Sequence, residues 1–411
     1  MADLNPFTLE HVESPWDTHA ALREAGVTLI PGTDIFAVSR HEDVEYVLMH
    51  PDRFSNLVGV NLAELPPELR ERARQTGALP ASDPPEHNHY RAIVGRQLSA
   101  RGVAPLESRV REIINGLIDT FAAEGSVELS KQFATPLTVL VFVEQMGIPP
   151  EDVPQVKEWV DCTIDAMSAA VGMLTPERTK EVMEGGQALR RYLVALARDR
   201  AANPRDDLLS HIVSTEMPGF GGRTLHDQEL EGMLVTLMMG GTETTLNMIC
   251  SGIWLLLNHP DQMADLVSDR SLIPNFVEEV LRIESPVQGL FRRTLEDTVV
   301  GGVTIPARSR VWVMYGSANR DPDLWDDPTR FDIHRHIKDH YAFGAGVHYC
   351  VGAPLARIEG RVAFEQLLSR LRDLRFAPGR NTFRHGPSHV IRGFRELWLE
   401  FTPEAPGQTY D

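Results

Sequence analysis

The sequence predicts a mainly α-helical fold with small β-sheets formed by its two ends. Apolar residues recur every three or four positions through the middle of the chain, from about 86 to 286, which is the pattern of amphipathic helices. Short apolar runs separated by Gly, Pro and Asp lie near the ends, at approximately 1–60 and 290–411. Strands at opposite ends of a helical chain gain partners by pairing with each other, so we expect one domain over 1–411.

The first fifty residues alternate between helical and strand patterns. Helices are expected at about 17–25 and 41–49, where apolar and polar residues follow a helical period. Two short strands are expected at about 27–30 and 35–39, because Pro31-Gly32 marks a turn between two apolar runs.

Strand patterns return after the helical middle, at about 298–303, 310–314 and 397–401. The stretch 321–332 is rich in Asp and Pro and predicts an irregular loop. A final helix is expected at about 354–371, since proline is favoured in the first turn of a helix and Pro354 stands there.

Composition and charge exclude several classes of protein. The net charge of −18, from 58 acidic and 40 basic residues, argues against nucleic acid as a partner, because phosphate binding needs a basic face. No apolar run approaches the ~20 residues that a membrane span needs, and the N-terminus has no basic start followed by an apolar run. We therefore expect a soluble, cytoplasmic monomer with no membrane or nucleic-acid partner. Cys162, Cys250 and Cys350 are too few and too scattered for a disulfide framework.

Cys350 lies in the most informative segment of the chain, Phe343-Gly-Ala-Gly-Val-His-Tyr-Cys-Val-Gly352, directly ahead of the last predicted helix. Glycines permit tight turns and close approach to a flat ligand. A cysteine at a helix N-terminus meets free amide hydrogens and the positive end of the dipole, which favour thiolate. The alternative is an inert buried cysteine in a glycine-rich turn.

Three further motifs have residues at spacings that suggest chemistry. Gly240-Gly241-Thr242-Glu243-Thr244 interrupts an apolar helical stretch, where adjacent glycines cost about 1 kcal/mol each relative to alanine; the alternative is a kinked helix whose threonines bond back to the preceding turn. Glu279 and Arg282 are three apart on one helical face. His87 and Arg91, in Asp83-Pro-Pro-Glu-His-Asn-His-Tyr-Arg91, are four apart and form a clamp suited to an anion, or else are ordinary surface charge.

The cysteine segment resembles the heme-binding loop of the cytochrome P-450 family, and the other three motifs resemble that family's motifs in the same order. The positions that match the loop in register are Phe343, Gly344, Gly346, His348, Cys350, Gly352, Leu355, Ala356 and Arg357. The resemblance implies the P-450 fold, a single large triangular domain with heme b between an oxygen-activation helix and the cysteine-loop helix. It implies Cys350 as the axial ligand of the iron.

The resemblance also implies roles for the remaining motif residues. Thr244 is the alcohol that hydrogen-bonds oxygen at the iron, and Glu243 links it to solvent. The expected heme-propionate ligands are His87, Arg91, Arg292 and His348, with Arg293 as the alternative to Arg292. Glu279 and Arg282 are structural, and either Arg330 or Arg335 completes their network.

The activity implied by the resemblance is insertion of one oxygen atom from dioxygen into a C–H bond of a small hydrophobic substrate, by hydroxylation or O-demethylation. Electrons are expected from a separate ferredoxin and its reductase, with NAD(P)H acting only indirectly, because the chain ends about sixty residues after the cysteine. Arg335, Lys338 and Arg357 are a hypothetical docking face. The rival classes are a non-oxygenating heme-thiolate sensor or carrier and a peroxide-driven member of the same fold.

The substrate is the least determined point. The string from Ser285 to Arg292 is similar to that of bacterial enzymes acting on small substituted aromatics, and a terpenoid or lipid-like substrate is the alternative. By resemblance, the pocket is expected to be lined by 56–79, helices around 161–189, Thr236 and Met239, 287–291, and 390–391.

Overall fold

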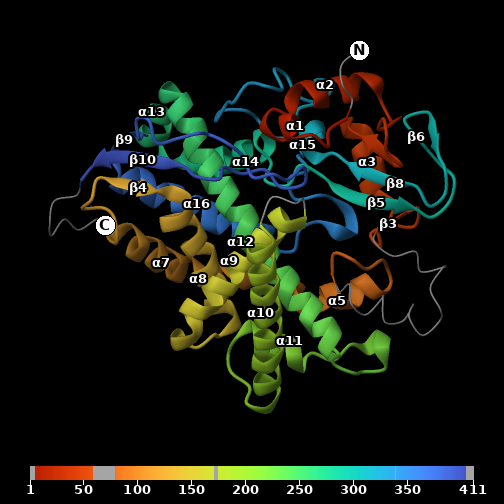
Figure 1. Cartoon of the computed structure of the whole chain (residues 1–411), viewed down its shortest axis with the longest axis horizontal. Helices are drawn as coiled ribbons and strands as arrows, with labels where there is room; N and C mark the ends of the chain where they lie inside the picture. The colour runs from red at the N-terminus through yellow and green to blue at the C-terminus, as the bar shows by residue number, and fades with distance from the viewer. Residues whose placement is uncertain (1–4, 59–78, 171–174, 338, 404–411) are drawn as a thin grey trace.

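Helices form most of the computed structural model, which describes residues 5–58, 79–170, 175–337 and 339–403. Figure 1 shows β3, β5, β6 and β8 at the right of the view, and β4, β9 and β10 at the upper left beside the helical body. The helices of the N-terminal part and the body are α1 (Leu9–Glu13), α2 (Trp16–Ala25), α3 (His41–Met49), α5 (Glu86–Gly95), α6 (Ala100–Val103), α7 (Glu107–Asp119), α8 (Thr135–Met146), α9 (Val153–Ala170), α10 (Pro176–Ala202) and α11 (Leu208–Ser214). The later helices are α12 (Asp227–Asn258), α13 (Pro260–Ser268), α14 (Ile273–Ile283), α15 (Tyr315–Ala318) and α16 (Ala353–Arg370).

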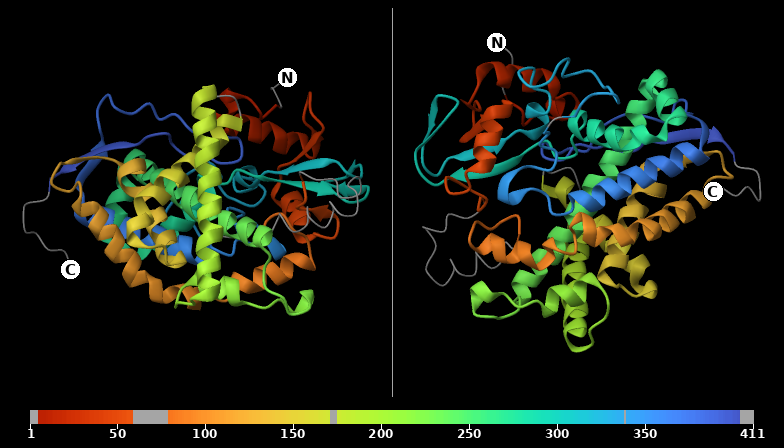
Figure 2. Two further views of the ribbon diagram at one scale, coloured as in Figure 1. Left: turned by 60° about the horizontal axis from the view of Figure 1, so that its bottom comes forward. Right: turned by 180° about the vertical axis from the view of Figure 1, so that it is seen from behind.

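Helix α12 is the central element of the body and packs against α8, α14 and α16 (Figure 1). It begins with a capping box, in which the Glu229 side chain accepts a 2.7 Å hydrogen bond from the His226 backbone amide. Its second half is apolar on nearly every side, and its residues Met248, Ile249 and Ile253 are buried in the main core. Figure 2 shows α16 alongside α7 on the back of the molecule. These contacts hold α12 and α16 at fixed positions.

The largest sheet joins the two ends of the chain, as the sequence predicted. Its strand order is β1-β2-β8-β5-β3, with β2 (Ile35–Val38) parallel to β8 (Arg310–Val313). The other strands of this sheet are β1 (Thr28–Leu29), β3 (Phe54–Ser55) and β5 (Leu290–Thr294). That the chain is a single domain stays a prediction.

A second sheet, in the order β4-β10-β9, attaches the C-terminal strands to the helical body. It contains β9 (Arg372–Phe376), β10 (Trp398–Thr402) and β4 (Ser126–Glu128), the last lying within the stretch expected to be helical. The expected strand at 298–303 is a hairpin of β6 (Thr298–Val300) and β7 (Val303–Ile305), which turns at Gly301-Gly302 with φ of +55° and +79°.

The expected helices are found at nearly their predicted ends: α2 ends at Ala25, α3 spans His41–Met49, and α16 spans Ala353–Arg370. Among the residues that the structure describes, no helix has the length and apolar character needed to cross a membrane.

Candidate functional site

The cysteine loop contains two glycines with positive φ and packs closely against α3. Gly344 and Gly346 have φ of +66° and +65°, a region that side chains with a Cβ rarely adopt. A Cβ at Gly346 would lie 2.6 Å from the Leu48 carbonyl oxygen, so only glycine lets the loop approach α3 this closely. The Cys350 amide donates to the Phe343 carbonyl at 2.9 Å and closes the loop.

The Cys350 side chain faces an internal cavity, at the start of α16. Backbone amides of Gly352 and Ala353 hydrogen-bond its sulfur, as expected for a cysteine at a helix N-terminus. Burial nevertheless raises the pKa of the thiol above its usual value, and the two amides, with Arg91 and Arg357, only partly oppose this effect. A metal ion bound to this sulfur would favour its ionised form.

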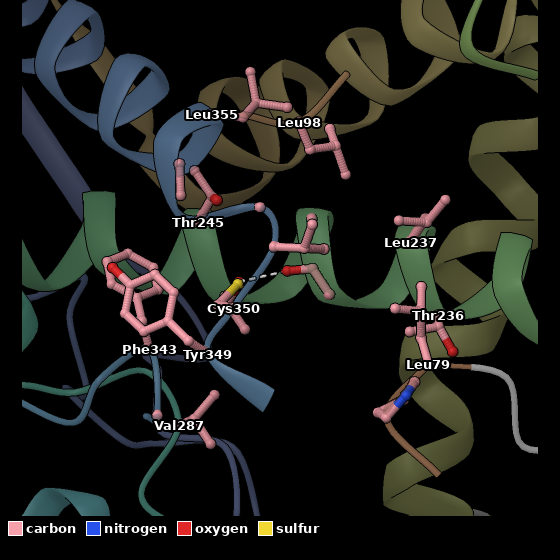
Figure 3. Close-up of a pocket in the computed structure, with 18 of the residues that line it drawn as sticks. Leu79, Leu98, Thr236, Leu237, Thr245, Val287, Phe343, Tyr349, Cys350 and Leu355 are labelled. Atoms are coloured by element: carbon pink, nitrogen blue, oxygen red, sulfur yellow. Dashed lines mark hydrogen bonds between the residues drawn. The ribbon is translucent and has the colours of Figure 1, made fainter. Parts of the chain in front are cut away.

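The cavity lies between α12 and the cysteine loop with the first turns of α16. In Figure 3, Cys350 lies beside α12, with Thr236 and Leu237 on one side of it and Thr245 on the other. Leu98 and Leu355 close the cavity above Cys350 in this view, and Val287 closes it below (Figure 3). Most of the lining is apolar, as in binding sites for hydrophobic ligands.

Four groups that carry or can acquire positive charge line the same cavity: His87, Arg91, Arg292 and His348. The His87 and His348 rings have centroids 4.1 Å apart, and His348 Nε2 is buried without a protein hydrogen-bond partner. Burial, followed by His87, Arg292 and Arg91, lowers the pKa of His348 to about 3. Such a cluster, with a free donor or acceptor, is suited to bind anions.

Arg292, and not its neighbour Arg293, faces the cavity. Arg292 is 6% exposed and lines it, whereas the Arg293 side chain donates to the Val58 carbonyl at 2.8 Å and the Arg308 carbonyl at 3.2 Å. The strand alternation of β5 turns adjacent side chains to opposite faces. The structure therefore brings Arg292 together with Arg91, His87 and His348, and the positive charge of this cationic cluster comes from its two arginines.

These residues fit the iron porphyrin that the resemblance implies. One sulfur with two amide donors suits an axial thiolate, and the cationic cluster with its unpartnered His348 nitrogen suits two carboxylates at the edge of a flat ligand. The described residues contain no cluster of three or more His, Cys, Asp or Glu that could hold a metal ion by itself.

Helix α12 passes the cavity without a break in its helical structure. Thr244 lines the cavity, and its hydroxyl donates to the Gly240 carbonyl at 2.7 Å, which is the back-bonding considered as the alternative for this motif. Thr242 makes the same bond to Met238 and is buried. Glu243 stands beside Thr244 but is not among the described residues that line the cavity, and burial raises its pKa to about 7.

The Glu279 carboxylate and the Arg282 guanidinium form a fully buried, two-pronged ion pair, with both nitrogen–oxygen distances at 2.7 Å. Arg335 is the third member, because its Nε lies 3.3 Å from Glu279 Oε1. The Arg330 side chain instead lies 3.9 Å from Asp332 and is 65% exposed. The network also fixes the irregular loop, since the Asp332 amide donates to Glu279.

The basic side chains expected to form a docking face near the cysteine are mostly bound to other groups of the same chain. Arg357 binds Glu278 through two hydrogen bonds, of 2.7 and 2.8 Å, and Arg335 is held by Glu279 and by carbonyls of its own loop. Lys338 lies outside the described residues.

The cavity lining matches the expectation only in part. Asn56, Leu79, Thr236, Val287 and Leu290 line it, while most of the expected 56–79 segment, residues 59–78, lies outside the described residues. Met239, the described side chains of 161–189 and the segment 390–391 do not appear among its described lining residues, and the side chains of 164–174 lie outside the described residues. One face of α8 and one buried acid of α16 were missed: Thr138, Val141, Phe142, Gln145, Met146 and Glu359. The α8 residues recur every three or four positions, which predicts a buried helix face. The same spacing occurs whether that face packs in the core or lines a cavity, so it does not distinguish the two.

Comparison with known proteins gives one consistent result. The family model described as "Cytochrome P450" matches residues 28–379. Cytochrome P450 107B1 of Saccharopolyspora erythraea is 35% identical over 98% of both chains, and the vitamin D(3) 25-hydroxylase of Pseudonocardia autotrophica is 33% identical over 96% of this chain and 95% of its own. The crystal structure of CYP109E1 from Bacillus megaterium, in complex with corticosterone, superimposes with a TM-score of 0.84 at 28% identity, covering 95% of this chain and 99% of that one.

Proposed function

Because this chain belongs to the cytochrome P450 family, we propose that Cys350 is the axial ligand of its heme iron and that the cationic cluster binds the heme propionates. The family makes the protein an oxygenating oxidoreductase that uses heme b and dioxygen. The observation that carries the assignment is the pairing, in one cavity, of an amide-supported sulfur with four groups suited to anions: His87, Arg91, Arg292 and His348. When bound, the heme supplies the iron at which dioxygen is activated, and a thiolate ligand favours cleavage of its O–O bond.

Glu243 and Thr244 are the proposed proton relay. The Thr244 hydroxyl hydrogen is engaged by the Gly240 carbonyl, so its oxygen lone pairs are free to accept a hydrogen bond. Burial brings the pKa of Glu243 to about 7, which suits a group that gives and regains a proton near neutral pH. A proton that moves from Glu243 to Thr244 Oγ1 would be passed onward into the cavity, while the hydroxyl hydrogen stays bonded to the Gly240 carbonyl. The presence of this pair favours an oxygenase over a sensor, a carrier or a peroxide-driven enzyme.

The proposed substrate is a lipid-like hydrophobic molecule of sterol or terpenoid type. The cavity has apolar walls formed by Leu79, Leu237, Val287 and Leu290. Such walls bind a ligand by burying its apolar surface and not through charged groups. Similar proteins include a vitamin D(3) 25-hydroxylase and a P450 crystallised in complex with corticosterone. A small substituted aromatic is the second candidate, favoured by the string from Ser285 to Arg292.

Electrons are proposed to come from a separate ferredoxin with its reductase. Since Arg335 and Arg357 are held in ion pairs, Arg96 and Arg101 are better candidates for the docking face: both are exposed, and α6, which carries Arg101, packs against α16. Replacing both with Gln is expected to slow reduction by ferredoxin most at low salt, with Arg375→Gln in β9 as the control. A cytoplasmic location stays a prediction.

The experiment that tests the central assignment is the carbon monoxide spectrum of the reduced, heme-loaded protein. Wild type and Cys162→Ser are expected to give the red-shifted thiolate band, and Cys350→Ser is expected to lose it. Retention of that band by Cys350→Ser would overturn the assignment. A spin-state titration of the ferric protein with corticosterone and with 4-methoxybenzoate then separates the two substrate candidates.

A further inference from the structure

Residues 5–13, at the start of the described chain, contact the loop 385–392 between β9 and β10, and we call these N-terminal residues the strap. The contacts between strap and loop include those of Phe7 with the His389 ring, Val12 with the Arg392 side chain, and Glu13 with the His385 backbone amide. The ring centroids are 4.8 Å apart, and the two hydrogen bonds are 2.8 and 3.0 Å long. The strap is therefore fixed to residues that lie 372 and 380 positions later in the sequence.

This loop is hydrogen-bonded to one wall of the cavity. The Gln288 amide donates to the Val390 carbonyl at 2.7 Å, and the Arg392 amide donates to the Pro286 carbonyl at 2.8 Å. Pro286 and Val287 line the cavity, and Val287 closes it from below in the view of Figure 3. The strap therefore holds the loop, and the loop holds the residues of this wall.

Two buried histidines lie where the strap meets α2. His11 of the strap and His19 of α2 are 5% and 1% exposed, and their ring centroids are 5.2 Å apart. His11 Nδ1 and both ring nitrogens of His19 are buried without a hydrogen-bond partner among the described residues, as is Nε1 of the neighbouring Trp312. Buried polar groups are normally hydrogen-bonded, and an added proton here would create a buried charge with no acceptor. The present contact therefore suits the neutral form of both rings.

The charged groups around the two rings oppose a further positive charge. The titratable and charged groups of the surrounding elements are the exposed Glu10 and Glu13 of the strap, Arg23 of α2, Glu284 after α14, Arg320 after α15, and His385, His389 and Arg392 of the loop. The Glu284 carboxylate is already bound by Arg320 at 3.1 Å and by Arg392 at 2.9 Å. Burial, and then the charge of Arg392, lowers the pKa of His11 to about 4. Burial is also the main cause that lowers the pKa of His19 well below its usual value, and it lowers the pKa of the two loop histidines.

We propose that the strap is an acid-sensitive fastening of the cavity wall: a proton on His11 or His19 releases the strap from its loop and loosens the wall behind that loop. This inference goes beyond the proposed oxygenase function, because it concerns access to the cavity and not the chemistry inside it. A protonated ring gains hydration only if it leaves its present contact. The strap is the element that moves, because it is short and lies near the chain end, whereas His19 belongs to the ten-residue helix α2, which packs against α15.

Hydrogen exchange of the heme-loaded protein, followed by mass spectrometry, tests the release directly. The comparison is between pH 7.5 and pH 5.8, which stays above the isoelectric point of about 5.3. After correction for intrinsic rates, the amides of the strap and its loop should open about fivefold more often at pH 5.8 from His11 alone, because its pKa rises from about 4 to 6.5 on release. His11→Phe should lose most of that increase, whereas His334→Gln, whose side chain is 52% exposed, should keep it. No increase at pH 5.8, or an equal increase over the whole chain, would overturn the proposal.

A second pair of variants makes the test independent of how His11→Phe folds. Glu13→Ala removes the hydrogen bonds between the strap and His385, so the strap should open several-fold more often even at pH 7.5, where both buried rings are neutral. Glu10→Ala in the same helix is the control, because Glu10 is exposed, and it should match wild type. Equal exchange in Glu13→Ala and wild type would contradict the role given to the strap.

The link to the cavity is measured by the rate at which n-butyl isocyanide, a neutral ligand, binds the reduced heme. This rate should rise several-fold in wild type between pH 7.5 and pH 5.8, and in Glu13→Ala already at pH 7.5, while His11→Phe should bind slowly at both pH values. Binding rates that do not follow the exchange of the strap would refute the link between strap and wall. The heme assignment would survive that result, because it is tested separately by the carbon monoxide spectrum.

Discussion

The buried ion pair between Glu279 and Arg282 gives the sharpest stability prediction. Both side chains are completely buried, and the Arg282 guanidinium makes two 2.7 Å hydrogen bonds to the carboxylate. Glu279→Gln removes the negative charge but nearly preserves the shape, so Arg282 keeps a buried charge whose remaining acceptors are carbonyl groups such as that of Asn319, at 2.9 Å. Breaking a buried pair from one side costs about 3–5 kcal/mol.

The chain offers a matched control at the same helical spacing. Arg178 and Glu181 on α10 are also three apart and 2.9 Å from each other, but their side chains are 38% and 63% exposed. An exposed pair contributes at most about 1 kcal/mol, so Glu181→Gln should change stability by less than that. The comparison separates the effect of burial from the effect of pairing.

Guanidinium unfolding, followed by circular dichroism and by tryptophan fluorescence, measures both variants. Coincidence of the two signals is needed before a free energy is calculated for a protein of this size. We expect the midpoint of Glu279→Gln to fall well below that of wild type and that of Glu181→Gln to stay near it. Equal and small losses in the two variants would refute the reasoning from burial.

Three other outcomes follow from the structure. Arg335→Gln should destabilise the fold by about 1–3 kcal/mol, the cost of an unsatisfied partner at buried Glu279, whereas exposed Arg330→Gln should stay within about 0.5 kcal/mol in the same unfolding assay. Burial, followed by Arg392 and His389, lowers the pKa of His11 to about 4. The unfolded chain therefore binds the extra proton between pH 6.5 and 4, and stability should fall by about 3 kcal/mol as the pH drops through that window; a urea titration series in which His11→Phe shows the same slope as wild type would contradict this. Gly346→Ala should lose about 1–3 kcal/mol and release heme faster, since its φ is +65° and its Cβ would meet the Leu48 carbonyl; unchanged heme retention in a dialysis assay would argue against that contact.

The parts of the fold that were predicted are those with local signals. Helices α2, α3 and α16 have periodic patterns long enough to recognise; Gly26 marks the end of α2, and Pro354 marks the start of α16. Strands β3 and β4 have two and three residues, too few for any period, and they exist because Thr294 and Trp398 lie opposite them from distant parts of the chain. The local sequence of β3 and β4 therefore could not predict these strand partners.

The candidate site divides in the same way. Cys350 and its glycines form one continuous segment, so their arrangement was accessible from the sequence. The choice between Arg330 and Arg335 depends on which side chain turns toward α14, and that is decided by the packing of an irregular loop. Glu359 reads as an ordinary polar residue of a helix, because its burial results from contact between α16 and α12 and not from its neighbours in sequence.

The parallel pairing of β2 with β8 has a consequence for synthesis of the protein. Ile35 pairs with Arg310, which is 275 residues later in the chain. About three quarters of the chain must therefore leave the ribosome before the largest sheet can form. Until then β2 presents an unpaired edge, the kind of surface on which nascent chains aggregate. The cysteine loop is made later still and needs α3 as its support, so cofactor capture belongs to the last steps of folding, and chaperone supply should limit the yield of loaded protein.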